Sequence, residues 1–523
     1  MKTPHIPFKI LVLAPFLGQD CLVWEKAPVR VDPTDLDQAI EDIQPTCSIS
    51  VPYSLCSDEA IELKFTKLKD FHPDSLVQNN HALQNLWEAK QWVEEAVKKN
   101  LAQQEINTRL EQWPNLPPIK EEIAPQKPPT ISRNSVDKIL DMVALPDEQS
   151  KQSPKSQDAI QQIETILKQI LELIFSDERF RMLESSWRGL NLLLRQINRE
   201  NSDLEIEIVP VSFNSLDETL AALTAEVIDA LPSLILVDID FDNSPRSLNL
   251  LEGIAQFAET LLVPAIAYIS SAFFHIETWQ DIKRLAFLPH YLEESPYARW
   301  QSLKKAQSSG WLAVTCNRFL LRYQYGKDNK PRTIPFEEEN PLWISPAWAL
   351  GSLICQSFVD TGWPTRFTDW QQIHIEDLPL NTKDQDTPLP TEISFDRDRI
   401  DQFIRSGIIP LAAAQGKDIA FVPDEITVGD TSLRFQLLLS RVTQLVLWCR
   451  DHCEKGLKGA DLEEELRKAF FLFWEKSGHS GPESLEISAG QPDQEDILPV
   501  RIMVKPSRDI LPSQKQVELN LRW

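Results

Sequence analysis

Two almost wholly apolar segments on either side of one helical segment constrain the fold of this chain more than any other feature. The apolar segments are residues 234–237 and 263–269, and residues 248–262 between them carry apolar side chains at helical spacing. Strands that are apolar on both faces are typical of a parallel sheet covered by helices on both sides. Such strand–helix–strand units cross over in the right-handed sense. The sequence therefore predicts an α/β fold.

Further strands and helices are expected on both sides of this unit. Strands are indicated by short apolar runs or by alternation of apolar and polar residues, and helices by apolar residues at a spacing near 3.6. Together they predict an α/β class with mixed sheets and flanking helices. The predicted strands are residues 8–13, 60–65 and 516–523, and the predicted helices are residues 81–99, 160–174, 433–455 and 461–476.

A proline-rich stretch divides the chain into a small N-terminal and a large C-terminal part. Prolines between residues 112 and 130 remove backbone donors and favour extended conformations, so we interpret this stretch as a linker. The predicted division is an α/β segment at residues 1–112, the linker at 113–132, a short amphipathic helix with a polar connector at 133–158, and an α/β region with a C-terminal strand at 159–523.

The composition argues against several classes of function. The chain carries a net charge of −25 and only 15 glycines in 523 residues. Duplex binding normally uses a basic stripe that displaces counterions, so we expect no nucleic-acid partner. The sequence contains no P-loop, dinucleotide-binding, nucleophile-elbow or H-E-x-x-H motif. We therefore expect no catalytic residues, no cofactor and no metal.

Cysteine content and hydropathy predict the compartment. Seven cysteines, an odd number in a long chain, do not indicate a disulfide framework. The early apolar run at residues 10–17 is too short to span a bilayer. We expect a cytoplasmic protein without membrane insertion.

Residues 180–190, Phe-Arg-Met-Leu-Glu-Ser-Ser-Trp-Arg-Gly-Leu, carry a resemblance to a known family. They resemble the F-x-x-L-E-x-x-W-R-G-L signature of the large contractile-sheath subunit (TssC, or VipB-like) of type VI secretion systems. Further ordered matches continue over about residues 130–523, and the sequence departs from the family's usual pattern at Lys304, Asn317 and Asp377. The signature positions, for which the resemblance implies a structural role, are Phe180, Leu183, Glu184, Trp187, Arg188, Gly189 and Leu190.

The first segment resembles the small sheath subunit (TssB, or VipA-like). Residues 7–13 are similar to its opening strand, and residues 68–73, Leu-Lys-Asp-Phe-His-Pro, to its L-x-D-F-x-P motif. In the family the two subunits are usually separate proteins that form a heterodimer. The chain therefore resembles a natural fusion of the two, and we expect the halves to pack together within one protomer.

The resemblance implies a structural polymer. Such subunits self-assemble into a helical sheath around an inner-tube (Hcp-like) protein, contact baseplate components, and contract to propel the tube and its effectors through a target membrane. It also implies an exchange of terminal strands between neighbours. We expect Val517, Leu519 and Leu521 to form such a strand, since an edge strand offers unpaired backbone groups; the alternative is a strand paired within its own domain.

The resemblance further implies a helix that a AAA+ sheath-recycling unfoldase recognises. The candidate face is Val136, Ile139, Leu140 and Val143, which would lie in a groove of that partner. A helix docked permanently on its own core is the alternative, and the two remain open.

Other clusters have a structural and a chemical interpretation. Asp238-x-Asp240-x-Asp242 could hold a metal, but Asn243 and Asn249 stand where a calcium loop needs Gly and Glu, so carboxylates that cap the next helix are favoured. The Trp187–Arg188 pair is interpreted as an aromatic anchor beside an Arg that makes a bidentate pair to an internal carboxylate, rather than as a ligand-stacking site.

The cysteines suggest an alternative to the sheath function from a different class of protein, a cysteine-dependent enzyme. Cys449, His452 and Cys453 share a helix, and Cys316 precedes Arg318. Buried apolar thiols are the favoured interpretation of all three cysteines. A nearer rival is the sheath of another phage-tail-like contractile device.

Overall fold

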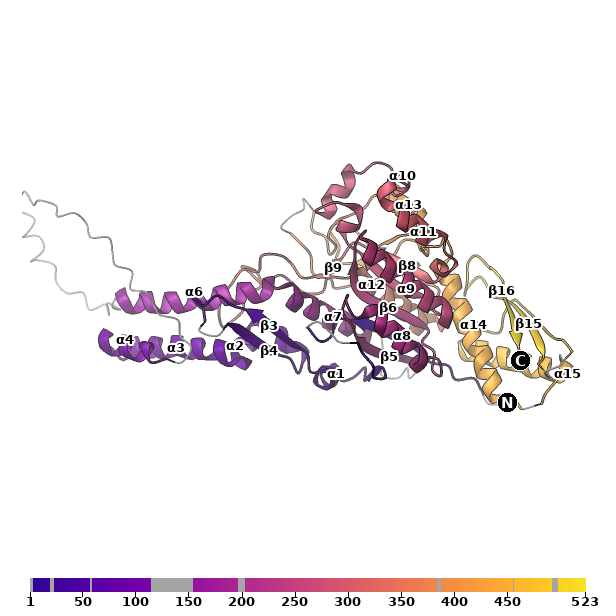
Figure 1. The fold of residues 1–523 in the computed structure, drawn as a ribbon, viewed down its shortest axis with the longest axis horizontal. Helices are drawn as coiled ribbons and strands as arrows, with labels where there is room; N and C mark the ends of the chain where they lie inside the picture. The colour runs from indigo at the N-terminus through magenta and orange to yellow at the C-terminus, as the bar shows by residue number, and fades with distance from the viewer. Residues whose placement is uncertain are drawn as a thin grey trace, which may run out of the picture.

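The structure, a computed structural model, describes residues 3–18, 23–56, 59–113, 154–195, 203–382, 387–454, 456–491 and 497–523. The predicted linker at residues 113–132 therefore lies outside the described residues except for residue 113. The predicted helix with Val136, Ile139, Leu140 and Val143 lies entirely outside them. Along its length the molecule has a helical arm, a central α/β body and a C-terminal lobe (Figure 1).

A seven-stranded sheet is the centre of the body. Its order is β11-β8-β7-β6-β1-β5-β2, and every neighbouring pair is parallel except β2 with β5. The strands are β1 (Phe8–Ala14), β2 (Val29–Val31), β5 (Leu204–Pro210), β6 (Leu234–Phe241), β7 (Ala265–Ile269), β8 (Leu312–Cys316) and β11 (Ile409–Pro410).

The first strand of the chain lies in the middle of this sheet. β1 pairs with β5 along its full length, from Phe8 with Leu204 to Ala14 with Pro210, and with β6 on its other side. Residues 1–112 therefore do not form a unit of their own. The small N-terminal part and the large part share one sheet and one core, which confirms the expectation that the two halves pack together.

Alternation along the strands explains how helices cover both faces. In β1, Ile10 and Val12 join the core beneath helices α7 (Glu178–Arg195) and α12 (Pro346–Thr361), whereas Leu11 and Leu13 join the core beneath α8 (Leu216–Val227) and α9 (Pro245–Leu261). A strand buried on both faces is apolar throughout. The predicted strand–helix–strand unit is therefore confirmed as β6-α9-β7.

The arm projects from one end of the body. It comprises the antiparallel pair β3 (Thr46–Ser50) and β4 (Ala60–Lys64), with a bundle in which α3 packs on α6 (Figure 1). Buried apolar side chains from α3 and α6 belong to the same core as the body. The helices of the arm and its base are α1 (Leu36–Ile43), α2 (Pro73–Asn79), α3 (His81–Lys98), α4 (Gln103–Glu111) and α6 (Pro154–Ser176).

The lobe lies at the opposite end. Helices α14 (Leu433–His452) and α15 (Gly459–Lys476) pack against a three-stranded antiparallel sheet, and both chain ends lie close to it (Figure 1). The order in that sheet is β14 (Ser484–Ala489), β15 (Pro499–Lys505) and β16 (Val517–Arg522).

Short elements connect these parts. The short α-helices are α10 (Leu288–Tyr291), α11 (Ala298–Lys305) and α13 (Arg397–Arg405). The 3-10 helices are η1 (Leu68–Phe71), η2 (Ser271–Phe274), η3 (Trp279–Arg284), η4 (Ser295–Tyr297) and η5 (Gln307–Trp311). The short strands are β9 (Phe319–Leu320), β10 (Trp343–Ile344), β12 (Ala412–Ala413) and β13 (Ala420–Phe421).

Candidate functional site

The C-terminal strand β16 is the candidate surface for contact between copies. Six register pairs join it to β15, from Val504 with Val517 to Pro499 with Arg522. Among the described residues no further strand pairs with β16, so its other edge borders no strand of its own chain. An edge of this kind presents backbone N–H and C=O groups to another chain.

Side-chain alternation fixes how this strand is held. Val517 is fully buried, and Leu519 and Leu521 are half-buried against the core that α14 and α15 form. Glu518 and Asn520 between them are exposed. The three predicted residues thus share the inner face of β16, which positions the strand without occupying its outer edge. The structure shows the intrachain pairing, and exchange with a neighbour remains a proposal.

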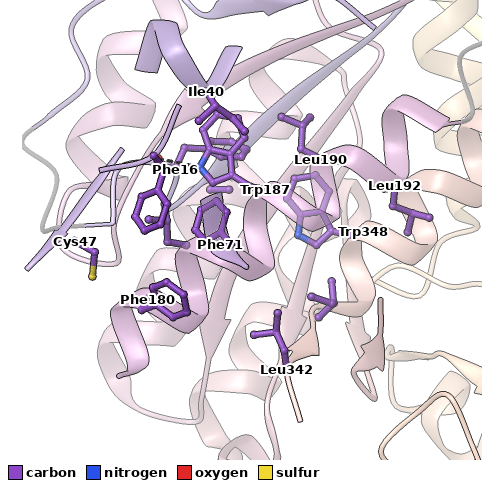
Figure 2. Packing of buried hydrophobic residues seen from close by; sticks show 14 of the residues in the cluster. Phe16, Ile40, Cys47, Phe71, Phe180, Trp187, Leu190, Leu192, Leu342 and Trp348 are labelled. Carbon is purple, nitrogen blue, oxygen red and sulfur yellow. Dashed lines mark hydrogen bonds between the residues drawn. The ribbon is translucent and has the colours of Figure 1, made fainter. Parts of the chain in front are cut away.

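The signature residues lie on α7, at the junction of the arm and the body. Phe180, Leu183, Trp187 and Leu190 are all buried, at the i, i+3, i+4 spacing of one helix face. Figure 2 shows Trp187 beside Phe16, which follows β1; their ring centroids are 4.8 Å apart, and the Trp187 indole N–H donates to the Phe16 carbonyl at 3.3 Å. This face of α7 therefore attaches the N-terminal part to the large part.

Gly189 permits a close contact in the same helix. A Cβ atom at this position would lie 2.4 Å from the indole ring of Trp348 on α12. Real Cβ atoms do not approach a ring so closely, so only glycine allows α7 and α12 to pack at this distance. The sequence did not indicate Trp348 as the partner.

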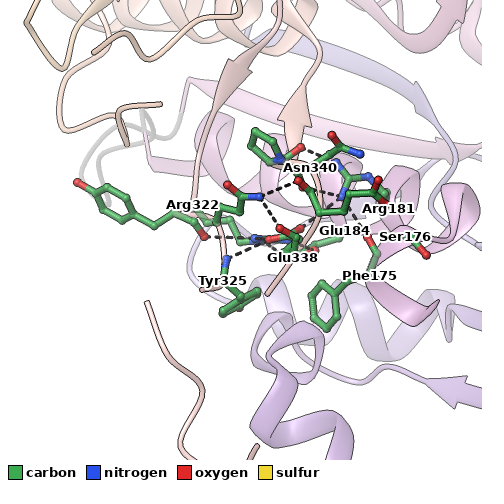
Figure 3. A network of polar contacts seen from close by, with 12 residues as sticks. Phe175, Ser176, Arg181, Glu184, Arg322, Tyr325, Glu338 and Asn340 are labelled. Carbon is green, nitrogen blue, oxygen red and sulfur yellow. Dashed lines mark hydrogen bonds and ion pairs between the residues drawn. The ribbon is translucent and has the colours of Figure 1, made fainter. Parts of the chain in front are cut away.

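A buried ion-pair network surrounds Glu184 (Figure 3). Arg322 binds Glu184 through two hydrogen bonds of 2.8 and 3.1 Å and Glu338 through two of 2.7 and 2.8 Å. Arg181 reaches Glu338 at 3.3 Å, and Arg188 donates to Glu184 at 2.7 Å. Two carboxylates and three guanidinium groups thus join α7 to the segment after β9.

The network determines the protonation of its members. Burial would raise the pKa of Glu184, but the guanidinium groups of Arg322 and Arg188 hold it below its usual value. Burial opposes the charge of Arg322, yet Glu184 and Glu338 raise the pKa of Arg322 above the ordinary arginine value. Glu184 and Arg322 are therefore both charged, and each compensates the other.

The sequence predicted only part of this network. Arg188 does pair with a carboxylate inside the protomer, as expected, but through one hydrogen bond to Glu184 one turn earlier. The bidentate arginine is Arg322, from a loop 138 residues further along the chain. No local pattern indicates a partner at that separation.

The carboxylates at the end of β6 have different partners. Asp242 accepts hydrogen bonds from the backbone N–H of Ser244 and the hydroxyl of Ser247, so it does help to begin α9. Asp238 accepts a hydrogen bond of 2.8 Å from Ser186 on α7. The expectation that these carboxylates cap α9 therefore holds for Asp242, which follows β6, and is wrong for Asp238, which lies inside β6 and contacts α7 instead.

The cysteines are apolar packing residues. Cys316 ends β8 and Cys449 lies in α14, both fully buried. Burial raises the pKa of each thiol far above its ordinary value, which suppresses the reactive thiolate. His452 stacks on Trp448 with centroids 4.2 Å apart. This arrangement gives no nucleophile and base pair at these cysteines.

Comparison with known proteins defines the class as tail-sheath proteins. The model of the family described as EvpB/VC_A0108, tail sheath N-terminal domain (VipB), matches residues 157–230 and 232–427, more than half of the chain. The chain belongs to this VipB family of type VI secretion sheath proteins. A second model, described as Type VI secretion system, VipA, VC_A0107 or Hcp2, matches residues 1–126, so both sheath parts are present in one chain.

The chain is also similar to a curated relative and, more distantly, to three solved structures. The type VI secretion system sheath protein TssC1 of Pseudomonas aeruginosa is 26% identical over 304 residues, which cover 51% of this chain and 61% of the relative; the chain spans about three fifths of that protein. Two solved structures come from the anti-feeding prophage. Its baseplate has 9% sequence identity and a TM-score of 0.36, and the match covers 65% of this chain and 76% of that chain. Its helical sheath in the contracted state has 9% identity and a TM-score of 0.34, and the match covers 64% of this chain and 77% of that chain. A third is the sheath tail protein Lin1278 of Listeria innocua, with 8% identity and a TM-score of 0.31, and the match covers 62% of this chain and 61% of that chain.

Within the described ranges, no helix combines the length and the apolar character that crossing a membrane requires.

Proposed function

We propose that this chain is a structural subunit of the contractile tail sheath of a type VI secretion system. One chain supplies both sheath parts, with residues 1–112 as the small part and residues 159–523 as the large part. Copies polymerise into a helical sheath around an inner-tube (Hcp-like) protein. The sheath contracts to drive that tube and its effectors through a target membrane.

The observation that carries this proposal is the position of β1. A strand from the VipA-like part lies between β5 and β6 of the VipB-like part, so the two form one rigid unit. A unit that must transmit force between neighbours needs such an interlocked core. The open edge of β16 supports a contact that continues from one copy to the next.

The same proposal assigns partners and compartment. Baseplate components would start the assembly in the cytoplasm, and a AAA+ unfoldase would recycle contracted sheath by binding the helix with Val136, Ile139, Leu140 and Val143. The chain would perform no catalysis of its own, and its energy would come from lattice contacts. The buried, protonated thiols of Cys316 and Cys449 support a non-enzymatic role.

Negative-stain electron microscopy tests this proposal. The full chain is purified alone and together with an inner-tube (Hcp-like) protein. We expect tubes of uniform diameter, with the inner-tube protein increasing their number or length. Material that stays monodisperse under all assembly conditions, in both preparations, would contradict the proposal.

A further inference from the structure

The three-stranded sheet of the lobe has two edge strands, which differ in what covers them. β14 lies at one edge and β16 at the other, with β15 between them. An edge strand offers a row of unpaired backbone N–H and C=O groups to any extended segment that approaches it. A sheet with two open edges can therefore grow on both sides, whereas a sheet with one open edge accepts a strand on that side alone.

The hydrogen-bond pattern identifies the backbone groups that β16 directs outward. Leu498 and Trp523, which lie directly beyond the register pairs of β15 with β16, exchange both backbone hydrogen bonds, at 3.2 and 2.8 Å. Bonded and non-bonded pairs alternate along an antiparallel ladder. Glu518, Asn520 and Arg522 therefore direct their backbone N–H and C=O groups away from β15.

The outer edge of β16 is open. Glu518, Asn520 and Arg522 are all exposed. Within the described part of the chain, their outward backbone groups have no hydrogen-bond partner. A strand that approached this edge would find donors and acceptors at every second residue.

The same alternation identifies the outward groups of β14. Gly490, directly after β14, donates its N–H to the carbonyl of Pro499 in β15 at 2.8 Å. This marks the register pair of Gly490 with Pro499 as a bonded one, so the next pair along β14 is non-bonded. Leu485, Ile487 and Ala489 therefore direct their backbone N–H and C=O groups away from β15.

Helix α15 closes this second edge. Arg467 donates to the carbonyl of Leu485 at 3.0 Å, and Glu463 accepts from the N–H of Ala489 at 2.8 Å. Ile487, between these two residues of β14, is only 6% exposed. Glu463 and Arg467 are one turn apart and so lie on the same side of α15. A helix with charged side chains laid along an edge is one of the ways in which proteins prevent unwanted strand pairing.

We propose that Glu463 and Arg467 close the β14 edge, so that the lobe sheet takes up an extended strand of a second copy only at β16. The second copy as the source of that strand rests on the proposed sheath function, whereas the closure of β14 does not. Because only one edge is open, the sheet ends after one added strand. This arrangement permits a specific contact and prevents the open-ended sheet growth that leads to aggregation.

The double variant Glu463→Ala/Arg467→Ala tests the closure, since it removes both side chains that bind the edge of β14. Sedimentation of the full chain over a concentration series is the measurement, and thioflavin T fluorescence reports new sheet. We expect association at a concentration about tenfold lower than for the wild type. Glu464→Ala/Lys468→Ala, which removes an exposed ion pair of the same helix, is the matched control and should behave like the wild type.

A proline shows whether the new association uses the β14 edge. Ala489→Pro removes an outward N–H group but no donor of the ladder with β15. Added to the double variant, it should return the association to the wild-type concentration, with urea unfolding showing that each variant is folded. A double variant that behaves like its control, or association by a folded triple variant at the lowered concentration, would overturn the closure of β14.

Asn520→Pro tests the open edge and separates it from the sheath function. It removes an outward N–H of β16 without removing a donor to β15, so it should prevent tube formation, whereas Asn520→Ala should not. Tubes formed by Asn520→Pro would overturn β16 as the accepting edge. If the wild type forms no tubes, the sheath function and the second copy as partner both fail, and sedimentation of the double variant still decides whether β14 is closed.

Discussion

At the scale of single residues, the junction of the arm and the body contains buried charges that depend on one another. Glu184 is fully buried and is compensated by Arg322 and Arg188. A buried pair contributes little net stability as a whole, but the loss of one partner leaves an uncompensated charge in a medium of low polarity.

Replacement of Glu184 by Gln should therefore destabilise the protein by about 3 kcal/mol. Urea unfolding followed by tryptophan fluorescence measures the change. Because the pKa of Glu184 is held below its usual value, its contribution is present above the pKa of the unfolded chain and is lost as pH falls through the folded value. The difference from wild type should thus be largest near neutral pH and should shrink in acid.

Glu464→Gln is the control for this prediction. Glu464 forms an exposed pair with Lys468 in α15, and exposed pairs contribute little. An equal loss of stability in both variants would show that the buried position of Glu184 has no special effect.

Asp238 should have the opposite pH dependence. Burial raises its pKa to about 6 from 3.8, so its folded state binds a proton more tightly than its unfolded state. Stability contributed by the protonated form is present below the unfolded pKa and is lost as pH rises toward 6. This rise in the pKa of Asp238 corresponds to a loss of up to about 3 kcal/mol in the free energy of unfolding above pH 6.

Asp238→Asn tests this sign. Its side chain still accepts from Ser186 but carries no charge. We expect the variant to be more stable than wild type at pH 8 and equal to it near pH 4, by urea unfolding at each pH. A variant less stable than wild type at pH 8 would show that the charged form of Asp238 is favoured.

At the scale of secondary-structure elements, β16 is the component on which assembly depends. It forms one edge of the lobe sheet, and its inner face is anchored by Val517. A truncated chain that ends at residue 516 should keep the body and arm folded, because neither core includes β16. It should nevertheless fail to form tubes.

Circular dichroism and sedimentation test that prediction together. The truncated chain should retain its helical signal and sediment as a small species, whereas Glu518→Gln, a change on the exposed face, should assemble normally. Tubes formed by the truncated chain at the wild-type concentration would exclude β16 as the contact strand.

The elements also show how far the sequence predicts the fold. Local periodicity predicted β6, α9, β7, α3, α14, α15 and β16 within a few residues, because each follows from side chains near one another in the chain. It could not place β1 between β5 and β6, because these pairings join residues 196 positions apart (Phe8 with Leu204) and 224 positions apart (Ile10 with Leu234). Apolar residues on both faces of β1 were compatible with that central position but did not select its neighbours.

In the candidate sites, too, the sequence predicted what depends on neighbouring residues and did not predict contacts between distant segments. The buried face of α7 follows from its helical spacing, and Glu184 was named among the signature residues. Arg322, Glu338 and Trp348, which complete that site, come from distant loops and helices. A pocket at the carboxyl end of the seven-stranded sheet was not predicted, because its lining residues come from separate segments that only the order and register of the strands bring together.

At the scale of the whole molecule, the two sheath parts behave as one folding unit. A protease site inserted near residue 120 separates them after folding. Because β1 is paired on both sides and its side chains join both cores, we expect the two fragments to elute together in gel filtration after complete cleavage. Fragments that separate without denaturant would mean that the connection alone holds the parts together.

Cryo-electron microscopy of the assembled material is the most direct test of the central claim, that copies of this single chain form the sheath lattice. We predict a helical tube with one chain per repeating unit, β1 between β5 and β6 of the same copy, and the outer edge of β16 paired with a strand from a neighbour. A lattice in which β16 contacts no other copy, or a preparation that forms no ordered tube, would contradict this account.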